Sequence, residues 1–128
     1  PGITFINLQV KNFDNDLIKA RNEFGVEIHN FKDLDQYDNI DDTSALLAAL
    51  DMVISHCHAP YLISSAVGTP TKLTTNKQNT SVNNFLSAPV STKVDMYLKD
   101  MNDTWENVFS QIAKDLLQFK QKTGCQYH

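Results

Sequence analysis

The fold is decided by residues 41–70, which read DDTSALLAALDMVISHCHAPYLISSAVGTP. Their pattern predicts a short helix, a buried strand over residues 52–55, a turn with the sequence HCHAP, and a second helix. Pro60 suits the first turn of this second helix, because proline lacks the N–H group that would be unbonded there. Gly68 and Pro70 are typical of a helix end. A strand, a tight turn and a helix in this order predict one unit of an α/β protein.

Similar units extend the pattern toward both ends of the chain. Residues 3–10, ITFINLQV, predict a buried strand, and a helix ending at Gly25 and a short strand over residues 26–29 follow it. Residues 71–75 predict a fourth strand, and the alternation in residues 93–98 predicts a fifth strand at an edge of the sheet. Because the connections are short and contain helices, the strands are expected to be parallel.

The last helix is predicted from a start signal and a long apolar stripe. Asp103 and Glu106 have the spacing of a capping box, in which two side chains help to satisfy the backbone N–H groups that open a helix. A polar loop is expected over residues 76–92, and a frayed tail over residues 121–128. The stripe that should face the sheet consists of Trp105, Val108, Ile112, Leu116 and Phe119.

Together these elements predict the α/β class. We expect a three-layer sandwich around a mostly parallel, five-stranded Rossmann-like sheet, in a single domain over residues 1–128. If the first and third strands are neighbours, their carboxyl ends flank one crevice, and such sheets bind ligands there. Gln9 would then face His56, Cys57 and His58 across that crevice.

The composition narrows the classes of function. The chain has 128 residues and a formal net charge of −4, and it contains no basic stripe, which argues against binding to nucleic acid. No apolar run approaches the roughly 20 residues that span a bilayer. The two cysteines do not suggest a disulfide framework, so a cytoplasmic location is expected. Because the first residue is Pro1 and not Met, we interpret the chain as a domain excised from a larger protein.

The HCHAP turn permits three interpretations. In the first, the turn binds a metal ion: His56 and His58 point in the same direction and act as ligands. His29, or the Cys and His of the carboxyl-terminal tail, would be further candidate ligands. Alternatively, His58 directs positive charge toward an anion at the amino end of the following helix. In the third interpretation the turn binds nothing, and Cys57 packs as a small apolar residue. A nucleophilic Cys57 would need a third, orienting group that the sequence does not provide.

Other features of the chain are assigned structural roles. The nucleotide-binding motifs GxGxxG and GxxxxGK[ST] are absent. Five aspartates within residues 33–42 predict a solvated loop, because the central Gly and final Glu of an EF-hand are missing. Ser64 and Ser65 lie within the helix after the HCHAP turn and are expected to bond locally. The buried face of that helix is predicted to consist of Leu62, Ile63, Ala66 and Val67.

Four segments of the chain resemble one enzyme family in sequence and in order. They are FINLQV, FGVEIHNF, DLDQYDNIDDTSALLAALDMVIS and AVGTP, and the similarity spans roughly residues 3–75. The segments resemble the carboxyl-terminal half of bacterial heptosyltransferase-like glycosyltransferases, and most closely the domain that follows tetratricopeptide repeats in some of these proteins. The resemblance implies one half of a GT-B fold. In that fold this Rossmann-like half holds the nucleotide sugar, and a second Rossmann-like domain completes the cleft.

The resemblance also implies which residues line the donor site. The family carries an Asp followed by hydroxyl residues in the turn after the third strand. In this chain Cys57 stands at the position of the Asp, and His58 and Ala59 stand at the hydroxyl positions. Leu62 replaces a His of the family, whereas Gln9 matches the end of the first strand. The implied donor crevice, with its altered phosphate turn, is lined by Gln9, His56, Cys57, His58 and Ala59.

The function that we expect is that of a nucleotide-sugar-binding-type domain of a glycosyltransferase-like protein. The nucleotide sugar would be a substrate, no cofactor is expected, and the partners in the parent protein would be a second Rossmann-like domain and tetratricopeptide repeats. This chain alone is not expected to catalyse transfer, because an acceptor must be held against the donor. The alternatives are a degenerate, non-catalytic scaffold or interaction domain, and a metal or redox site at His56, Cys57 and His58.

Overall fold

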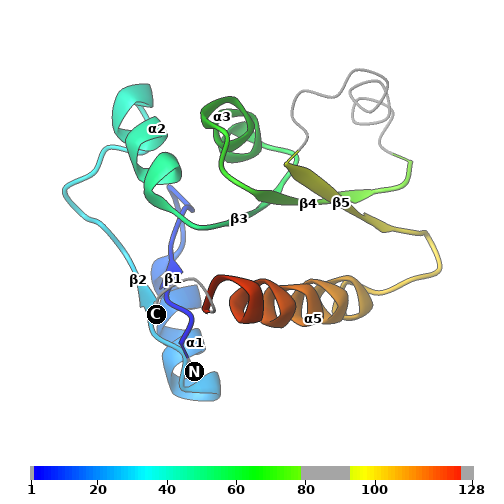
Figure 1. Cartoon of the computed structure of the whole chain (residues 1–128). Coiled ribbons are helices and arrows are strands. Elements are labelled where there is room, and N and C mark those ends of the chain that lie inside the picture. Colours follow the sequence, from blue (N-terminus) through cyan, green and yellow to red (C-terminus); the bar gives the residue numbers. More distant parts are fainter. Residues whose placement is uncertain (1, 79–92, 125–128) are drawn as a thin grey trace. The chain divides into compact units, whose positions relative to one another are not determined.

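The computed structural model describes residues 2–78 and 93–124 (Figure 1). The contacts within the chain divide it into two compact units, Pro1–Leu46 and Leu47–His128. Each unit has its own parallel β-sheet. The polar loop expected over residues 76–92 lies mostly outside the described residues.

The first unit is a strand–helix–strand motif followed by a loop and most of a second helix. Strand β1 (Phe5–Ile6) pairs in parallel with β2 (Ile28–His29), and Phe5 lies opposite Ile28 in the register. Helix α1 (Asp14–Phe24) connects the two strands, and α2 (Ile40–Ala49) begins in this unit and ends in the second one. Gly25 ends α1 in the left-handed conformation with φ of 63°, as its place in the sequence predicts.

Strand β1 is much shorter than the eight-residue strand expected over residues 3–10. The side chain of Asn7 explains this difference. Its Oδ1 accepts a hydrogen bond from the backbone N–H of Gln9 at 3.0 Å, and its Nδ2 donates to the carbonyl of Gln9 at 3.0 Å. These local bonds compete with the strand ladder and turn the chain away from it directly after β1.

The second unit has three layers. Its parallel sheet has the order β3-β4-β5, and the strands are β3 (Val53–His56), β4 (Thr71–Asn76) and β5 (Val94–Lys99). Helix α3 (Ala59–Val67) and helix α5 (Trp105–Gly124) lie on opposite faces of this sheet (Figure 1). The α/β class, the parallel pairing and the edge position of the last strand are therefore confirmed, and the architecture is compatible with a Rossmann-like fold.

The backbone hydrogen bonds divide the strands between two sheets, β1-β2 and β3-β4-β5, instead of joining all five in one ladder. The crevice that we expected between the ends of the first and third strands required these two strands to pair. No such pair occurs among the described strands. Gln9 therefore belongs to the first unit, and His56, Cys57, His58 and Ala59 belong to the second.

The two faces of the three-stranded sheet carry separate apolar clusters. Beneath α3, Tyr61 and Leu73 are buried together, with Cys57, Val94 and Met96 packed against them. Beneath α5, the cluster contains Tyr97 with the helix residues Val108 and Ile112, and Trp105 and Leu116 flank it. Four of the five residues of the predicted stripe of α5, all except Phe119, therefore pack against the sheet.

The start and the end of α5 differ from the expectation by a few residues. Thr104 occupies the position before the helix, and its hydroxyl lies 3.4 Å from the backbone nitrogen of Asn107. Asp103 instead accepts bonds from the backbone N–H of Thr104 and from the side chain of Asn107, each at 2.7 Å. The predicted capping box is thus wrong, because Asn107 and not Glu106 is the third helical residue. The helix continues to Gly124, beyond the expected start of a frayed tail, and residues 125–128 lie outside the described residues.

The buried face of α3 is also different from the predicted one. Tyr61, Ser64 and Ser65 are buried, whereas Leu62 is 45% exposed. Both serine hydroxyls donate to the carbonyl of Tyr61, at 3.0 and 2.7 Å, as expected from local bonding. Small side chains whose hydroxyls are already bonded can be buried against the sheet beside Tyr61, whereas Leu62 and Val67 face outward.

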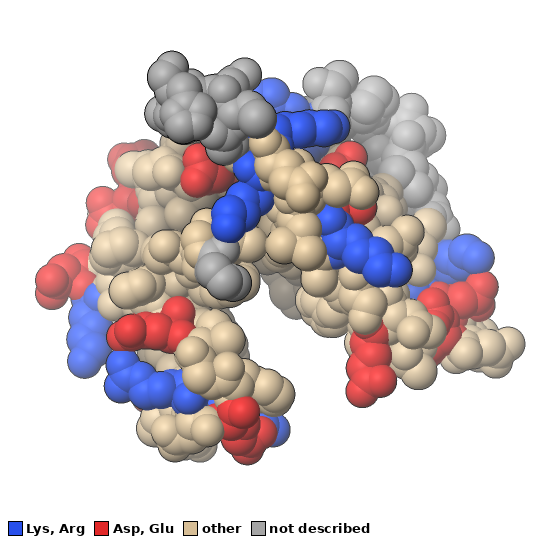
Figure 2. Space-filling model, turned by 60° about the horizontal axis from the view of Figure 1, so that its bottom comes forward, with Lys and Arg blue, Asp and Glu red and all other residues tan. Residues whose placement is uncertain are grey.

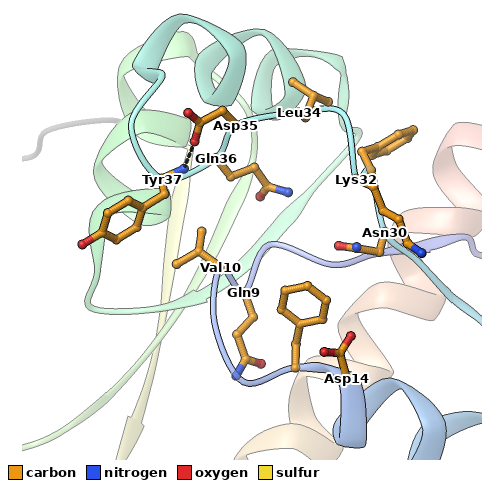
Figure 3. Close-up of a pocket in the computed structure, with 11 residues that line it drawn as sticks. Gln9, Val10, Asp14, Asn30, Lys32, Leu34, Asp35, Gln36 and Tyr37 are labelled. Atoms are coloured by element: carbon orange, nitrogen blue, oxygen red, sulfur yellow. Dashed lines mark hydrogen bonds between the residues drawn. The ribbon is translucent and has the colours of Figure 1, made fainter.

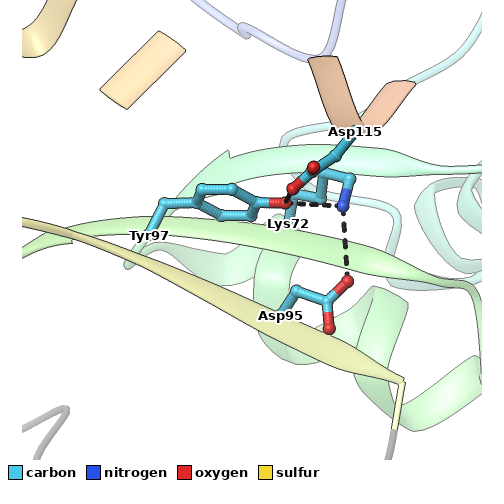
Figure 4. A network of polar contacts seen from close by, with 4 residues as sticks. All are labelled: Lys72, Asp95, Tyr97 and Asp115. Atoms are coloured by element: carbon cyan, nitrogen blue, oxygen red, sulfur yellow. Dashed lines mark hydrogen bonds and ion pairs between the residues drawn. The ribbon is translucent and has the colours of Figure 1, made fainter. Parts of the chain in front are cut away.

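A polar network joins α5 to the strands beneath it (Figure 4). The ammonium group of Lys72 on β4 donates to the hydroxyl of Tyr97 at 2.7 Å and to Asp95 at 3.3 Å, and the Tyr97 hydroxyl donates to Asp115 on α5. Only 6% of the Lys72 side chain is exposed. A buried ammonium group requires such partners, because burial without them is costly.

The network shifts the pKa values of two of its members upward. Burial alone would lower the pKa of Lys72, but its bonds to Tyr97 and Asp95 outweigh this effect and raise it above the ordinary value. Burial, together with the bond to Asp115, raises the pKa of Tyr97. Both groups therefore favour their protonated forms in the folded chain.

We expect the change Tyr97→Phe to lower the free energy of unfolding by about 1–3 kcal/mol, because Lys72 and Asp115 then lose a buried partner. Urea denaturation measures this loss. Tyr37→Phe is the matched control, since Tyr37 is 65% exposed and should change the stability little. Equal stabilities of the two variants would contradict the role assigned to the network.

The same network predicts a loss of stability in alkaline solution. A group whose pKa is raised by folding stabilises the fold below its unfolded pKa, and that contribution disappears as the pH rises through the folded value. For Tyr97 and Lys72 the loss should begin above about pH 10. Unfolding curves collected between pH 8 and pH 11 test this, and the decline should be shallower in Tyr97→Phe. Identical declines in both proteins would rule out the Tyr97 phenol as a source of the alkaline loss of stability.

Candidate functional site

The HCHAP corner connects the carboxyl end of β3 to the amino end of α3. The backbone N–H of His58 donates to the carbonyl of His56 at 2.7 Å, which makes the turn tight. His58 is extended, with φ of −135° and ψ of 178°, and it directly precedes the first helical residue, Ala59. Pro60 lies in the first turn of α3, as the sequence predicts.

The two histidines of the corner lie on the same side of the chain. Their ring centroids are 5.5 Å apart, in an edge-to-face arrangement. His56 also contacts Trp105 of α5, with ring centroids 5.8 Å apart, and its Nδ1 lies 3.4 Å from the Thr74 hydroxyl of β4. The His56 ring is therefore fixed by partners from two neighbouring elements of the second unit.

Cys57 lies on the other side of the corner. It is half-buried and packs against the cluster of Tyr61 and Leu73 beneath α3. Burial, followed by the charge of a nearby Cys57 thiolate, raises the pKa of the Tyr61 phenol. This position agrees with the expectation that Cys57 packs as a small apolar residue. It also directs the thiol toward the sheet, away from the two imidazole rings.

The amino end of α3 is electrostatically open. Its first turn contains no acidic residue, and His58 and Ala59 are exposed to solvent. The positive end of the helix dipole and the N–H groups of the first turn are therefore not neutralised by the helix itself. Such an end can bind a phosphate group or another anion. The HCHAP corner is thus accessible to a ligand and is not sealed by other side chains.

The metal interpretation of this corner finds no support within residues 2–78 and 93–124. No three His, Cys, Asp or Glu side chains in these ranges are placed to hold one metal ion. His56 and His58 share a side, but Cys57 points elsewhere, so the three residues do not converge. In the first unit, Asp35 orders its loop by accepting bonds from the N–H groups of Tyr37 and Asp38, at 3.0 and 2.9 Å.

A second candidate site lies in the first unit, where a pocket of about 370 Å³ opens at the carboxyl ends of β1 and β2 (Figure 3). The pocket is lined by residues that follow each strand and by the first residues of α1. Its polar side chains are Gln9, Asp14, Asn30, Lys32, Asp35 and Gln36. This pocket was not predicted from the sequence. The sequence feature that could have indicated this pocket is the mixture of amide, carboxylate and aromatic residues in the loop after the second strand.

The five residues that were expected to line one crevice come from both units. His56, Cys57, His58 and Ala59 form the HCHAP corner of the second unit, and Gln9 lines the pocket of the first. Thr74 also lies at the corner, and Trp105, which the sequence placed in the apolar stripe of the last helix, is an additional residue there.

The surface charge agrees with the absence of a basic stripe in the sequence. Figure 2 shows Lys and Arg residues interspersed with Asp and Glu residues on the face that it presents. Across the part of the chain that is described, no helix is both long enough and apolar enough to cross a membrane.

Comparisons with known proteins give one similarity. Protein FlbA of Caulobacter vibrioides is 30% identical to the chain over 119 residues, which make up 93% of this chain and 20% of FlbA. The chain thus spans about a fifth of the length of this relative. No protein-family model matches the chain, and no solved structure matches it.

The position of Cys57 leads to a prediction about the carboxylate that the resembling family has there. We expect Cys57→Asp to lower the free energy of unfolding by about 1–3 kcal/mol more than Cys57→Ala does, because the carboxylate would lose hydration against Tyr61 and Leu73. Chemical denaturation of the two variants at neutral pH gives the difference. If the Asp variant is as stable as the Ala variant, the side chain at this position points into solvent and is free to face a ligand.

Proposed function

We propose that this chain is a nucleotide-sugar-binding-type domain of a glycosyltransferase-like protein, and that its second unit binds the diphosphate of the donor at the HCHAP corner. The observation that carries the proposal is the amino end of α3. It follows the carboxyl end of a parallel strand directly, it carries no acidic residue in its first turn, and it stands beside two imidazole rings. Parallel α/β sheets bind anionic ligands in this position.

The resemblance of residues 3–75 to heptosyltransferase-like enzymes supports the same function. In such a protein, a second Rossmann-like domain and tetratricopeptide repeats would be partners of this chain within a longer polypeptide, at a cytoplasmic location. Group transfer would depend on that second domain, because the acceptor must be held against the donor. The role of this chain would be to bind and orient the donor.

Each corner residue has a distinct part in the proposal. His58 stands at the helix start and offers a ring N–H to a phosphate oxygen, while the exposed Ala59 is the first residue of the helix. His56 is held by Thr74 and Trp105 and positions the neighbouring His58 ring through their contact. Cys57 contributes packing and no ligand contact.

The alternative function is a degenerate, non-catalytic scaffold or interaction domain. The inward position of Cys57 favours it, because the carboxylate of the resembling family is replaced here by a side chain that packs against the core. The hydroxyl positions that would donate to phosphate hold His58 and Ala59. Binding of nucleotides separates the two functions directly.

Binding should appear as thermal stabilisation by UDP, ADP or GDP. A ligand at 100 times its dissociation constant adds about 2.7 kcal/mol to the free energy of unfolding, which raises the melting temperature by several degrees. A thermal melt of the full chain with each nucleotide measures this shift. If none of the three nucleotides shifts the melting temperature at millimolar concentration, the scaffold function is the correct one.

The variant His58→Ala locates the binding. It should weaken the affinity for the stabilising nucleotide about 5- to 10-fold, since one charge-assisted hydrogen bond is lost. His29→Ala is the control, because His29 is an exposed histidine of the other unit. Equal affinities of the two variants would place the nucleotide away from the HCHAP corner.

A further inference from the structure

We propose that the pocket of the first unit is a separate binding site for an uncharged ring that carries neighbouring hydroxyl groups, the chemistry shared by free sugars and by the ribose of nucleosides. The pocket lies wholly within residues 9–37, so this inference does not depend on the anion site at the HCHAP corner. It rests on the volume, the lining groups and the charge of the pocket.

The position and the size of the pocket suit a small ligand. It opens where the parallel strands β1 and β2 end, and its lining comes from the segments that follow these strands and from the start of α1. Ligands of α/β folds bind at this end of the strands. The volume of about 370 Å³ lies in the range of about 300–1,000 Å³ that is typical of ligand pockets.

The polar groups of the pocket match hydroxyl groups. Amide side chains both accept and donate hydrogen bonds and carboxylates accept them, and a pair of adjacent hydroxyl groups needs both acceptors and donors. Several of these side chains are already held in place. Asn30 accepts a bond from Asn7 at 2.9 Å, Gln9 donates to the carbonyl of Lys11 at 3.1 Å, and Asp35 accepts two N–H groups of its own loop. Little order would therefore have to be created on binding.

The apolar groups of the pocket match the C–H face of such a ring. Val10, Phe31 and Tyr37 line the pocket and remain 42%, 44% and 65% exposed. Three large apolar side chains exposed around one cavity are characteristic of a binding surface. The ammonium group of Lys11 lies 4.3 Å from the centre of the Tyr37 ring, which restricts the ring's orientation. A flat ligand can stack on these side chains while its hydroxyl groups meet the amides and carboxylates.

The charge of the pocket disfavours a phosphate group. Two carboxylates, Asp14 and Asp35, line it together with the ammonium group of Lys32, and the ammonium group of Lys11 is engaged with the face of the Tyr37 ring. Asp14 and Asp16 also occupy the first turn of α1, so the positive end of this helix is met by its own side chains. A phosphate would be repelled by the carboxylates, whereas an uncharged ring with hydroxyl groups would not.

The test is a binding titration of the full chain followed by two-dimensional amide NMR, with D-glucose, N-acetyl-D-glucosamine, uridine, adenosine and inorganic phosphate as probes. We expect saturable shifts around the pocket with at least one sugar or nucleoside and none there with phosphate. A response to the sugars identifies a free saccharide as the source of the ring, and a response to the nucleosides alone identifies ribose. Saturation at the pocket by neither class, or by phosphate alone, would overturn the proposal.

Variants with matched controls locate the binding. Tyr37→Ala and Asp14→Asn should each weaken the affinity for the responding probe about fivefold or more. The controls are Phe24→Ala, an aromatic residue that is 71% exposed outside the pocket, and Asp16→Asn, which lies in the same helical turn as Asp14 but does not line the pocket. Affinities that stay equal in the pocket variants and the control variants would overturn the proposal, even if the probe binds.

Discussion

The HCHAP corner depends on a buried chain of hydroxyl groups that holds α3 against the sheet. Ser64 is fully buried, and its hydroxyl lies 3.0 Å from the carbonyl of Tyr61 and 2.8 Å from the hydroxyl of Thr71 at the start of β4. Thr71 donates in turn to the carbonyl of Thr69, and the hydroxyl of Thr69 donates to the carbonyl of Leu47. Buried hydroxyl groups without partners would be costly, so this arrangement fixes one distance between helix and strand. The start of α3, and with it the exposed corner, is positioned as a consequence.

The sequence predicted those parts of the fold that local chemistry controls. Gly25 and Gly68 end their helices in the left-handed conformation, Pro60 lies in the first turn of α3, and most of the stripe of α5 packs against the sheet. The buried face of α3 could not be predicted from apolar periodicity. Ser64, which faces the sheet, is stabilised by the Thr71 hydroxyl of β4, and this contact arises only when the helix packs on the sheet. The length predicted for strand β1 was too great, because a pattern of apolar residues does not reveal the side-chain bonds of Asn7 to Gln9.

The candidate site was also predicted only in part. Alternation along an extended segment correctly placed His56 and His58 on one side, and it leaves Cys57 on the other. The partners that hold His56 come from β4 and α5, and the contact with Trp105 depends on how α5 packs on the sheet, which no spacing in the sequence indicates. The pocket of the first unit was missed for a related reason. It forms because the loop after β2 folds back on itself through Asp35, and because Gln36 reaches the carbonyl of Asn7 at 3.4 Å.

Helices α1 and α3 begin with different electrostatic character, and this difference separates the two candidate sites. Helix α1 begins with Asp14 and Asp16, which satisfy its positive end, whereas α3 begins without an acidic residue. The same backbone dipole is therefore neutralised in one unit and exposed in the other. A phosphate group gains free energy only where the helix end is exposed, and hydroxyl groups can bond to the carboxylates that repel it. The selectivity that we propose for each site thus follows from the residues that open its helix.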